Sequence, residues 1–378
     1  MTDIVAADTH VLLAGFSTRA IAESAARAGF RVTAVDAFAD LDQHPAVNAV
    51  AVATGFSPQA AACASRGIAC DAVAYVSSFE NHPDAVRALA SGRALWGNAP
   101  GVLAAVRNPQ LVREALSRRH LVSPALSGDG EGPWLLKPVA SGGGAGIQPW
   151  ERGTAAPAGH YVQEMIDGEP GSVAFIASRN GVRVLGIFRQ LIGLSAFGAS
   201  GLQYCGNILD ASLPASSWMW RAAVALAHAV TDEFALVGVN GIDFIARGGE
   251  LYAVEVNPRW SASMELVERA HGVSVFATHV KACVDGVLPS FDATTAAPIE
   301  RSIGKAVIFA RHDVTVGDTA SWCADWSTRD VPRPGTMIRA GQPVCTVFAE
   351  APTVDACREQ LEARAAHVFA QLRGWAGR

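Results

Sequence analysis

Short apolar runs alternate with Ala-rich, helix-forming segments over the first hundred residues. His10–Ala14 and Arg31–Val35 are apolar runs, and between them Ala20–Ala28 has helical composition and ends at Gly29. The same alternation continues, and it predicts a strand, a helix, a strand and a helix at Ala49–Ala53, Ala60–Arg66, Ala72–Tyr75 and Pro83–Leu89. Because such alternation is typical of a parallel sheet, we expect a Rossmann-like α/β domain over residues 1–100.

The pattern then changes to longer strands and helices, and we expect an α+β domain of two lobes over residues 101–295. The first lobe, about 125–165, has strands at Trp134–Pro138 and Tyr161–Ile166, after a helix at Arg107–Arg119 with Pro109 in its first turn. The second lobe, about 166–295, is expected to contain two strand pairs, Ser172–Ala177 with Val182–Arg189 and Val237–Ala246 with Leu251–Val256, and helices at Trp218–Glu233, Met264–Ala270 and Val275–Val284. Asn180-Gly181 predicts a hairpin turn in the first pair.

After about residue 296 the apolar runs become short. Val307–Ala310, Thr336–Ile338 and Val344–Phe348 read as strands, with proline and glycine between them. Val354–Gln371 has the pattern of an amphipathic helix. We therefore expect a small β-rich domain with a terminal helix over residues 296–378.

Composition excludes several classes of protein. The chain has 378 residues and a formal net charge of -5, with no basic patch, so we expect no nucleic-acid partner. It has no apolar run of about 18 residues, which argues against a membrane span. Met1–Ile4 does not begin a signal peptide, and the seven cysteines form no C-x-x-C pair, so we expect a cytoplasmic protein with reduced thiols.

Lysine is rare in this chain. Only Lys137, Lys281 and Lys305 are lysines among thirty basic residues, and the others are arginines. Lys137 ends a predicted strand and precedes a loop that contains Ser141 and the glycines Gly142, Gly143, Gly144 and Gly146. Glycines allow successive backbone N–H groups to converge on an anion, and a lysine adds a compact positive charge. This loop predicts a phosphate site; the alternative is a flexible surface hairpin.

An acidic strand pair forms the second candidate site. Side chains alternate along a strand, so Glu255, Asn257 and Arg259 share one face. If the preceding hairpin has a three-residue loop centred on Gly249, Asp243 lies opposite Glu255, whereas a two-residue loop places them on opposite faces. Carboxylate and amide oxygens suit Mg²⁺ and an arginine suits phosphate, which predicts a metal–phosphate site. The alternative is an ordinary exposed polar face.

A third stretch, Tyr161–Glu169, offers backbone groups for an adenine edge and a carboxylate for ribose hydroxyls. The alternative is a plain strand and turn. The first turn of the chain, from Gly15 to Ala20, reads G-F-S-T-R-A rather than G-x-G-x-x-G, so a nicotinamide oxidoreductase lacks its usual support.

In combination and order, these stretches resemble the ATP-grasp superfamily over residues 8 to 290, and more specifically its carboxylate–amine ligases and its carboligase-like members related to biotin carboxylase. The resemblance implies ATP and Mg²⁺ as cofactors, with Mn²⁺ as a substitute. It implies Lys137 and Arg259 as catalytic residues, and Asp243, Glu255 and Asn257 as metal ligands. It places Ser141, Gly142, Gly143, Gly144 and Gly146 over the phosphates, and Gln163, Glu164, Met165, Ile166 and Glu169 around the adenosine.

The chain departs from the family pattern at two places. Gln163 stands where many relatives have an acidic residue. An earlier nucleotide-binding lysine is replaced by an arginine, for which Arg107 is the first candidate and Arg113 the alternative.

The family chemistry predicts an ADP-forming ligase that makes an acyl phosphate from a small carboxylate and transfers the acyl group to an amine. Glutamate ligation in the biosynthesis of a cofactor, such as a one-carbon carrier, is the preferred example. The candidate substrate contacts are Ser17, Arg19, Arg189, Gln203 and Glu265. The alternatives are a carboxylase that phosphorylates bicarbonate and a protein that binds nucleotide without turnover; a homo-oligomer is left open.

Overall fold

A computed structural model describes residues 8–52, 55–293 and 299–376 of the chain. Met1–Ile4 and Ala53, which entered the sequence-based expectations, lie outside these residues, as does the predicted domain boundary near residue 295. Within the described part, no helix has both the length and the apolar character needed to cross a membrane.

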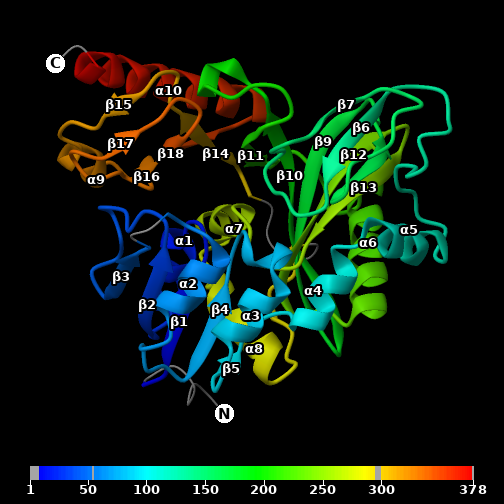
Figure 1. Cartoon of the computed structure of the whole chain (residues 1–378), viewed down its shortest axis with the longest axis horizontal. Helices are drawn as coiled ribbons and strands as arrows, with labels where there is room; N and C mark the ends of the chain where they lie inside the picture. The colour runs from blue at the N-terminus through cyan, green and yellow to red at the C-terminus, as the bar shows by residue number, and fades with distance from the viewer. Residues whose placement is uncertain (1–7, 53–54, 294–298, 377–378) are drawn as a thin grey trace.

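The N-terminal part is a five-stranded parallel sheet, as predicted. Its strands lie in the order β3-β2-β1-β4-β5 and are β1 (His10–Ala14), β2 (Arg31–Asp36), β3 (Val47–Ala51), β4 (Ala72–Tyr75) and β5 (Ala94–Leu95). The helices are α1 (Arg19–Arg27), α2 (Pro58–Ala64), the short 3-10 helix η1 (Phe79–Asn81) and α3 (Pro83–Leu89). This part lies at the lower left of Figure 1, in blue and cyan.

Two helices and a small sheet follow. The helix expected at Arg107–Arg119 is α5 (Pro109–Ser117), and an additional helix, α4 (Pro100–Val106), ends just before Arg107. Asn108 caps α5 with its side chain, and Pro109 at the first position needs no hydrogen-bond acceptor for its nitrogen. Arg107 therefore lies at a break between helices. The small sheet has the order β7-β6-β8, with β6 (Trp134–Pro138), β7 (Gln148–Trp150) and β8 (His160–Glu164).

An eight-stranded sheet is the centre of the molecule (Figure 1). Its order is β13-β12-β9-β10-β11-β14-β18-β16, and its strands are β9 (Glu169–Ser178), β10 (Gly181–Ile192), β11 (Tyr204–Leu209), β12 (Gly238–Arg247), β13 (Glu250–Asn257), β14 (Ser302–Phe309), β16 (Thr328–Arg329) and β18 (Pro343–Ala351). In the β9–β10 hairpin Ser178 pairs with Gly181, so the turn residues are Arg179 and Asn180, one position earlier than predicted.

The predicted C-terminal β-rich segment continues this sheet, because β14 pairs with β11. A separate pair, β15 (Val314–Thr315) and β17 (Met337–Ile338), lies beside it. The remaining helices are η2 (Ser195–Phe197), α6 (Trp218–Phe234), α7 (Ser263–His271), α8 (Val275–Val284), α9 (Ala320–Ala324) and α10 (Val354–Ala376).

Alternate residues of β9 pack into two different cores. Val173 and Phe175 share a core with α6, whereas Ala174 and Ile176 share one with α7 and α8. Strands that are apolar on both faces occur where helices cover both sides of a sheet. This double covering fixes β12 and β13, and with them the polar side chains that these strands present at their ends.

Candidate active site

A β-bulge brings the predicted metal ligands together. The β12–β13 turn has only the two residues Gly248 and Gly249, since Arg247 pairs with Glu250, so of the two alternatives the two-residue loop is the one that forms. The register shifts between Asp243 and Phe244, and Asp243 therefore pairs with Glu255 after all. Because a bulge adds one residue to one strand, it moves the following side chains to the other face. The extra residue here is Val254.

The Asp243 carboxylate is half-buried and lies beside a second carboxylate, that of Glu255. Gln190 Nε2 donates to Asp243 Oδ1 over 2.9 Å, and Asn257 Nδ2 donates to Asp243 Oδ2 over 3.0 Å. Burial, and after it the nearby Glu255, raise the pKa of Asp243 to about 7. Burial also acts to raise the pKa of Glu255, but Arg107 and Lys137 bring it below its ordinary value. The two carboxylates therefore differ: Arg107 and Lys137 favour the charged form of Glu255, whereas burial favours the protonated form of Asp243.

Lys137 reaches this site from the small sheet. Its ammonium donates to Gln163 Oε1 over 2.9 Å and lies 3.5 Å from the carbonyl oxygen of Val254, the bulge residue. Burial lowers the pKa of Lys137, while Glu255 and Asp243 act in the opposite direction. In the described structure the hydrogen-bond partners of this buried ammonium are neutral oxygens rather than carboxylates.

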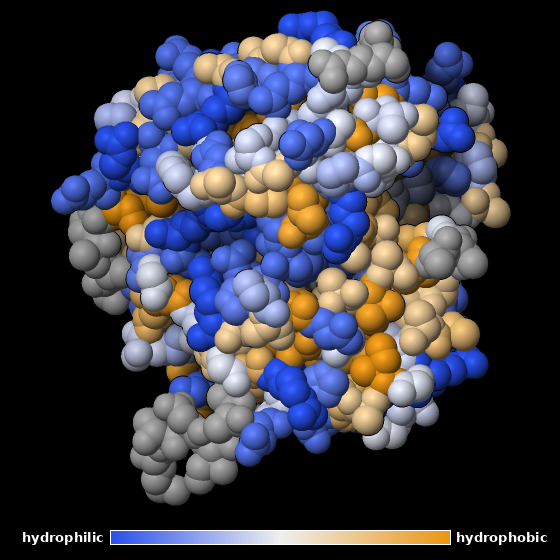
Figure 2. Space-filling view, turned by 90° about the vertical axis from the view of Figure 1, so that its left-hand side faces the viewer, coloured by the Kyte–Doolittle hydropathy of each residue, from blue (hydrophilic) through white to orange (hydrophobic). Residues whose placement is uncertain are grey.

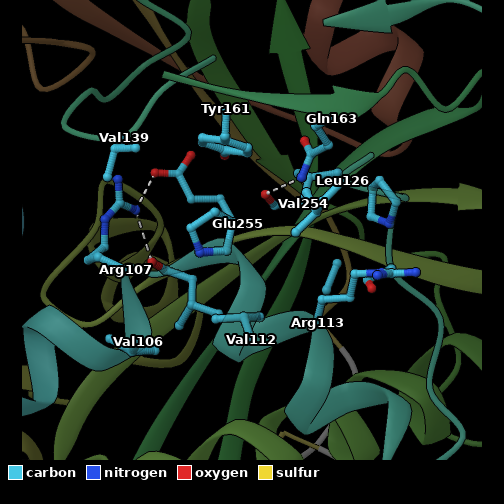
Figure 3. A pocket seen from close by; sticks show the side chains of 15 residues that line it. Val106, Arg107, Val112, Arg113, Leu126, Val139, Tyr161, Gln163, Val254 and Glu255 are labelled. Atoms are coloured by element: carbon cyan, nitrogen blue, oxygen red, sulfur yellow. Dashed lines mark hydrogen bonds and ion pairs between the residues drawn. The ribbon is translucent and has the colours of Figure 1, made fainter. Parts of the chain in front are cut away.

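Arg107 and Arg259 complete the charge around the acids. Arg107 forms an ion pair with Glu255 and donates to the carbonyl of Val256 over 3.1 Å (Figure 3). Arg259 Nη2 donates to Asn257 Oδ1 over 3.2 Å. Arg113, the alternative candidate for the missing lysine, is exposed on α5. It lines the pocket that Arg107 and Glu255 also line, but of the two arginines only Arg107 contacts the Glu255 carboxylate. We call Lys137, Arg107, Arg259, Asp243 and Glu255 the β13 cluster.

Two contacting residues were not predicted from the sequence. Glu80 and Asn81 lie in η1, the short helix after β4. Glu80 Oε1 accepts from Arg259 Nε over 2.7 Å, and its buried Oε2 has no partner in the described structure. Asn81 Oδ1 accepts from Arg107 Nε over 3.0 Å. The available signal was a carboxylate and an amide at the carboxyl edge of a parallel sheet, where α/β proteins bind ligands.

The glycine loop packs against residues 200–204. The carbonyl of Gly143 accepts from Tyr204 N over 3.0 Å, and Ser141 O accepts from Asn81 Nδ2, also over 3.0 Å. Gly144 has a positive φ of 80°, and a Cβ there would lie 2.0 Å from the carbonyl oxygen of Leu202. This conformation therefore requires glycine at 144. The loop connects β6 to β7 beside the β13 cluster.

The predicted adenosine contacts extend along and beyond β8. Gln163 faces Lys137, whereas the Glu164 carboxylate accepts from Ala125 N over 3.1 Å. Met165 is exposed, Ile166 is buried and Glu169 is exposed at the start of β9. Their role with adenosine stays a prediction, and Gln163 is the one among them that contacts the β13 cluster in the described structure.

The predicted substrate contacts divide into two groups. Ser17 and Arg189 are exposed, and Arg189 pairs with Asp210 over 3.1 Å. Gln203 lies beside the glycine loop, where its carbonyl accepts from Gly193 N. Arg19 and Glu265 contact each other over 2.8 Å and are both buried. Together with Asp330 and Lys305 they form a second group, the Arg19 cluster.

The acids of the β13 cluster fit a hard divalent cation. No set of three or more His, Cys, Asp or Glu side chains in the described residues is arranged as a metal site. Asp243 and Glu255 with the Asn257 amide nevertheless form an all-oxygen donor set, which Mg²⁺ prefers. Burial raises the pKa of Asp243, and a cation bound beside it would favour its charged form. These residues would hold Mg²⁺; the substitution by Mn²⁺ stays a prediction.

Comparison with known proteins agrees with this geometry. Residues 105–263 match the family model of the ATP-grasp domain, and this segment contains the glycine loop, β8 and the complete β12–β13 pair. The chain carries an ATP-grasp domain. The family that the sequence resembles is thereby confirmed, as is the predicted fold class.

Solved structures resemble the chain over nearly its full length. L-amino acid ligase from Bacillus licheniformis has 16% identity and a TM-score of 0.67, covering 94% of this chain and 96% of the ligase. The ADP complex of N5-carboxyaminoimidazole ribonucleotide synthetase has 18% identity and a TM-score of 0.71, covering 99% and 100%. The biotin carboxylase domain of Hydrogenobacter thermophilus 2-oxoglutarate carboxylase, with MgADP and bicarbonate, has 14% identity and a TM-score of 0.71, covering 93% and 88%. At these identities the likeness concerns the fold. No curated protein sequence matches the chain.

Proposed function

We propose that this ATP-grasp protein is an ADP-forming carboxylate–amine ligase that uses ATP and Mg²⁺. The observation that carries the proposal is the β13 cluster, in which two half-buried carboxylates, a buried lysine and two arginines from separate parts of the chain converge. Such a cluster suits a reaction in which negative charge on phosphate must be held and aligned.

The proposed reaction has two steps. A carboxylate oxygen of the first substrate attacks the γ-phosphorus of ATP, and the bond to the β–γ bridging oxygen breaks to release ADP. The amine nitrogen of the second substrate then attacks the acyl carbon, the acyl–oxygen bond breaks to release phosphate, and the nitrogen loses a proton. Mg²⁺, when bound, supplies charge neutralisation and alignment of the phosphates.

The residues of this chain have separate tasks in these steps. Lys137 would stabilise the charge of the transferred phosphoryl group, for which its neutral oxygen partners leave it available. Arg259, oriented by Glu80, would bind the acyl phosphate. Asp243, Glu255 and Asn257 would hold Mg²⁺, and the glycine loop, Ser141 to Gly146, would exclude water from the acyl phosphate.

The substrates can be identified by the products of the reaction. Purified protein is incubated with ATP, Mg²⁺ and pools of carboxylates and amines that include glutamate, while ADP release and product masses are measured. A condensation product whose formation needs both a carboxylate and an amine is the expected result. An ADP release that needs bicarbonate alone would instead support the carboxylase alternative, which the neighbouring carboxylase structure makes worth testing.

A lysine pair provides the control for the site. Lys137→Ala is expected to lower the rate of ADP formation at least about 100-fold, since electrostatic stabilisation of this kind contributes that much. Lys281→Ala removes an exposed lysine on α8 and is expected to leave the rate unchanged. Equal rates for the two variants would contradict the role of Lys137. ATP binding without turnover in the unaltered protein would favour the non-catalytic alternative.

A homo-oligomer also stays a prediction for this chain. The Hydrogenobacter domain is described as a dimer. Light scattering of the purified protein measures the mass of the particle directly and distinguishes a dimer from the 39.4 kDa monomer.

A further inference from the structure

A polar cavity lies between α1 and α7, apart from the pocket at the β13 cluster. Six charged side chains line it, namely Glu23, Arg27, Glu265, Glu268, Arg269 and Arg329. They come from the first helix of the N-terminal sheet, from the helix that follows β13 and from β16. On this side of the molecule, strongly hydrophilic side chains gather in a hollow between its upper and lower halves (Figure 2). Nothing in the proposed reaction uses this cavity.

The acids of the cavity already have cationic or hydrogen-bonding partners behind them. Glu265 contacts Arg19 over 2.8 Å and Lys305 over 2.7 Å. Glu268 accepts from Val275 N over 2.8 Å and also from Ser24 Oγ and an Arg27 nitrogen. The negative charges of Glu265 and Glu268 are therefore largely balanced by these neighbouring groups.

The arginines of the cavity are less well matched. Arg269 lies 3.5 Å from Glu265, farther than the two cations that share this carboxylate, and it stacks on the Phe348 ring at 3.7 Å. Among the described residues Arg329 forms no ion pair, and its Nη1 donates only to the carbonyls of Asp325 and Thr328. Arg269 and Arg329 therefore line one cavity with a single ion-pair partner between them, the Glu265 carboxylate, which Arg19 and Lys305 contact more closely.

The effect of this arrangement is visible in the charge balance of Arg269. Burial lowers the pKa of Arg269. Glu265 acts to raise it, Arg19 and Arg329 act to lower it, and Glu23 acts weakly to raise it. Like charges that line a cavity repel one another, and an anion between them would remove this repulsion.

We propose that the cavity binds a small anion that bears a carboxylate or phosphate group, held between the guanidinium groups of Arg269 and Arg329. Guanidinium groups match both anions with paired N–H donors. Arg27, whose side chain is half exposed, also lines the cavity, where it pairs with Glu268. A bound anion would connect α1, α7 and β16, and hence the N-terminal sheet, the segment after β13 and the C-terminal strands.

Calorimetric titration of the full chain tests the proposal without any assay of activity. Inorganic phosphate and succinate are titrated separately, which distinguishes the two anion chemistries. Arg329→Gln is expected to weaken binding of the preferred anion at least tenfold, while Arg329→Lys retains part of the affinity because it keeps the charge. Arg118→Gln removes an exposed arginine that pairs with Glu233 on the opposite side of the central sheet and is expected to have no effect.

A further variant separates this cavity from the nucleotide site. Lys137→Ala is expected to bind the anion with unchanged affinity, whatever its effect on ADP formation. Three results would overturn the proposal: no binding of either anion, equal affinity in the unaltered protein and a folded Arg329→Gln variant, or loss of binding in Lys137→Ala. The last result would show that the anion occupies the nucleotide site.

Discussion

The β13 cluster and the Arg19 cluster are both buried groups of opposite charges, and they differ in how those charges are balanced. Burial acts to lower the pKa of Arg19, but Asp330 and Glu265 raise it well above its ordinary value. Burial acts to raise the pKa of Glu265, but Arg19 and Lys305 hold it far below. In the β13 cluster, by contrast, the pKa of Asp243 is raised and that of Lys137 is lowered.

The difference indicates which cluster is complete without a ligand. Arg19, Glu265 and Asp330 are each stabilised in their charged forms by their neighbours. This suits a structural connection between α1, α7 and the C-terminal strands. The charges of Asp243 and Lys137 in the β13 cluster are kept at a cost, because burial outweighs the neighbours that favour their charged forms. A site kept at such a cost gains stabilisation when a charged ligand arrives. The comparison therefore assigns a structural role to the Arg19 cluster and a role in ligand binding to the β13 cluster.

Removing the central cation of the Arg19 cluster is the largest expected change in stability. Arg19→Met leaves Glu265 and Asp330 buried with less compensation, and we expect a loss of about 3–5 kcal/mol in the free energy of unfolding. Arg118→Met, which removes an exposed ion pair with Glu233, is expected to cost about 0–1 kcal/mol. Denaturant unfolding measures both. A small loss for Arg19→Met, close to that of Arg118→Met, would remove the contrast between the clusters.

The β13 cluster is expected to respond to pH in the ligand-free protein. The folded pKa of Asp243, about 7, lies above its ordinary value of 3.8. Between these values the folded protein keeps a proton that the unfolded chain releases, so stability falls as pH rises through this window. Asp243→Asn is expected to flatten this dependence and to stabilise the ligand-free protein near pH 7 by roughly 1–2 kcal/mol. Thermal unfolding at several pH values measures it, and an unchanged slope in Asp243→Asn would contradict the assignment.

The glycine loop provides the smallest of these changes. In Gly144→Ala the new Cβ would collide with the Leu202 carbonyl, so the loop must leave its position. We expect ADP formation to fall about tenfold, equivalent to about 1.4 kcal/mol, with little change in stability. Gly142→Ala is the matched control, because a Cβ there meets no atom within 4 Å. Steady-state kinetics compares them, and equal rates would show that the loop position does not matter.

Local patterns predicted the elements of the fold well, since strands and helices follow from apolar spacing and from turn residues. They could not predict contacts between distant segments. Glu80 and Asn81 meet Arg259 and Arg107 across the chain. Neither contact can be predicted from the residues next to it in the sequence, because both depend on how distant segments pack. The candidate substrate contacts Arg19 and Glu265 were recognised as notable charges, but their mutual pairing depends on how α1 and α7 pack.

The bulge at Val254 shows the same limit within a single hairpin. Counting residues from the turn placed Asp243 opposite Glu255 only with a loop one residue longer than the observed one. The insertion of a residue into the ladder has no strong sequence signal, because any residue can occupy the bulge. The spacing of the acidic motif was therefore informative, whereas the geometry that joins its two halves was not.

The pairing of β11 with β14 has a consequence for any attempt to divide this protein. A chain cut near residue 295 would leave β11 with a free row of backbone N–H and C=O groups. It would also uncover Cys205 and Ile208, which lie in a core shared with α10. An open apolar edge of this kind recruits strands from other molecules and leads to aggregation. The C-terminal segment thus completes the eight-stranded sheet. Exchanging this segment for that of a related protein would require β11, the partner of β14, to be exchanged with it.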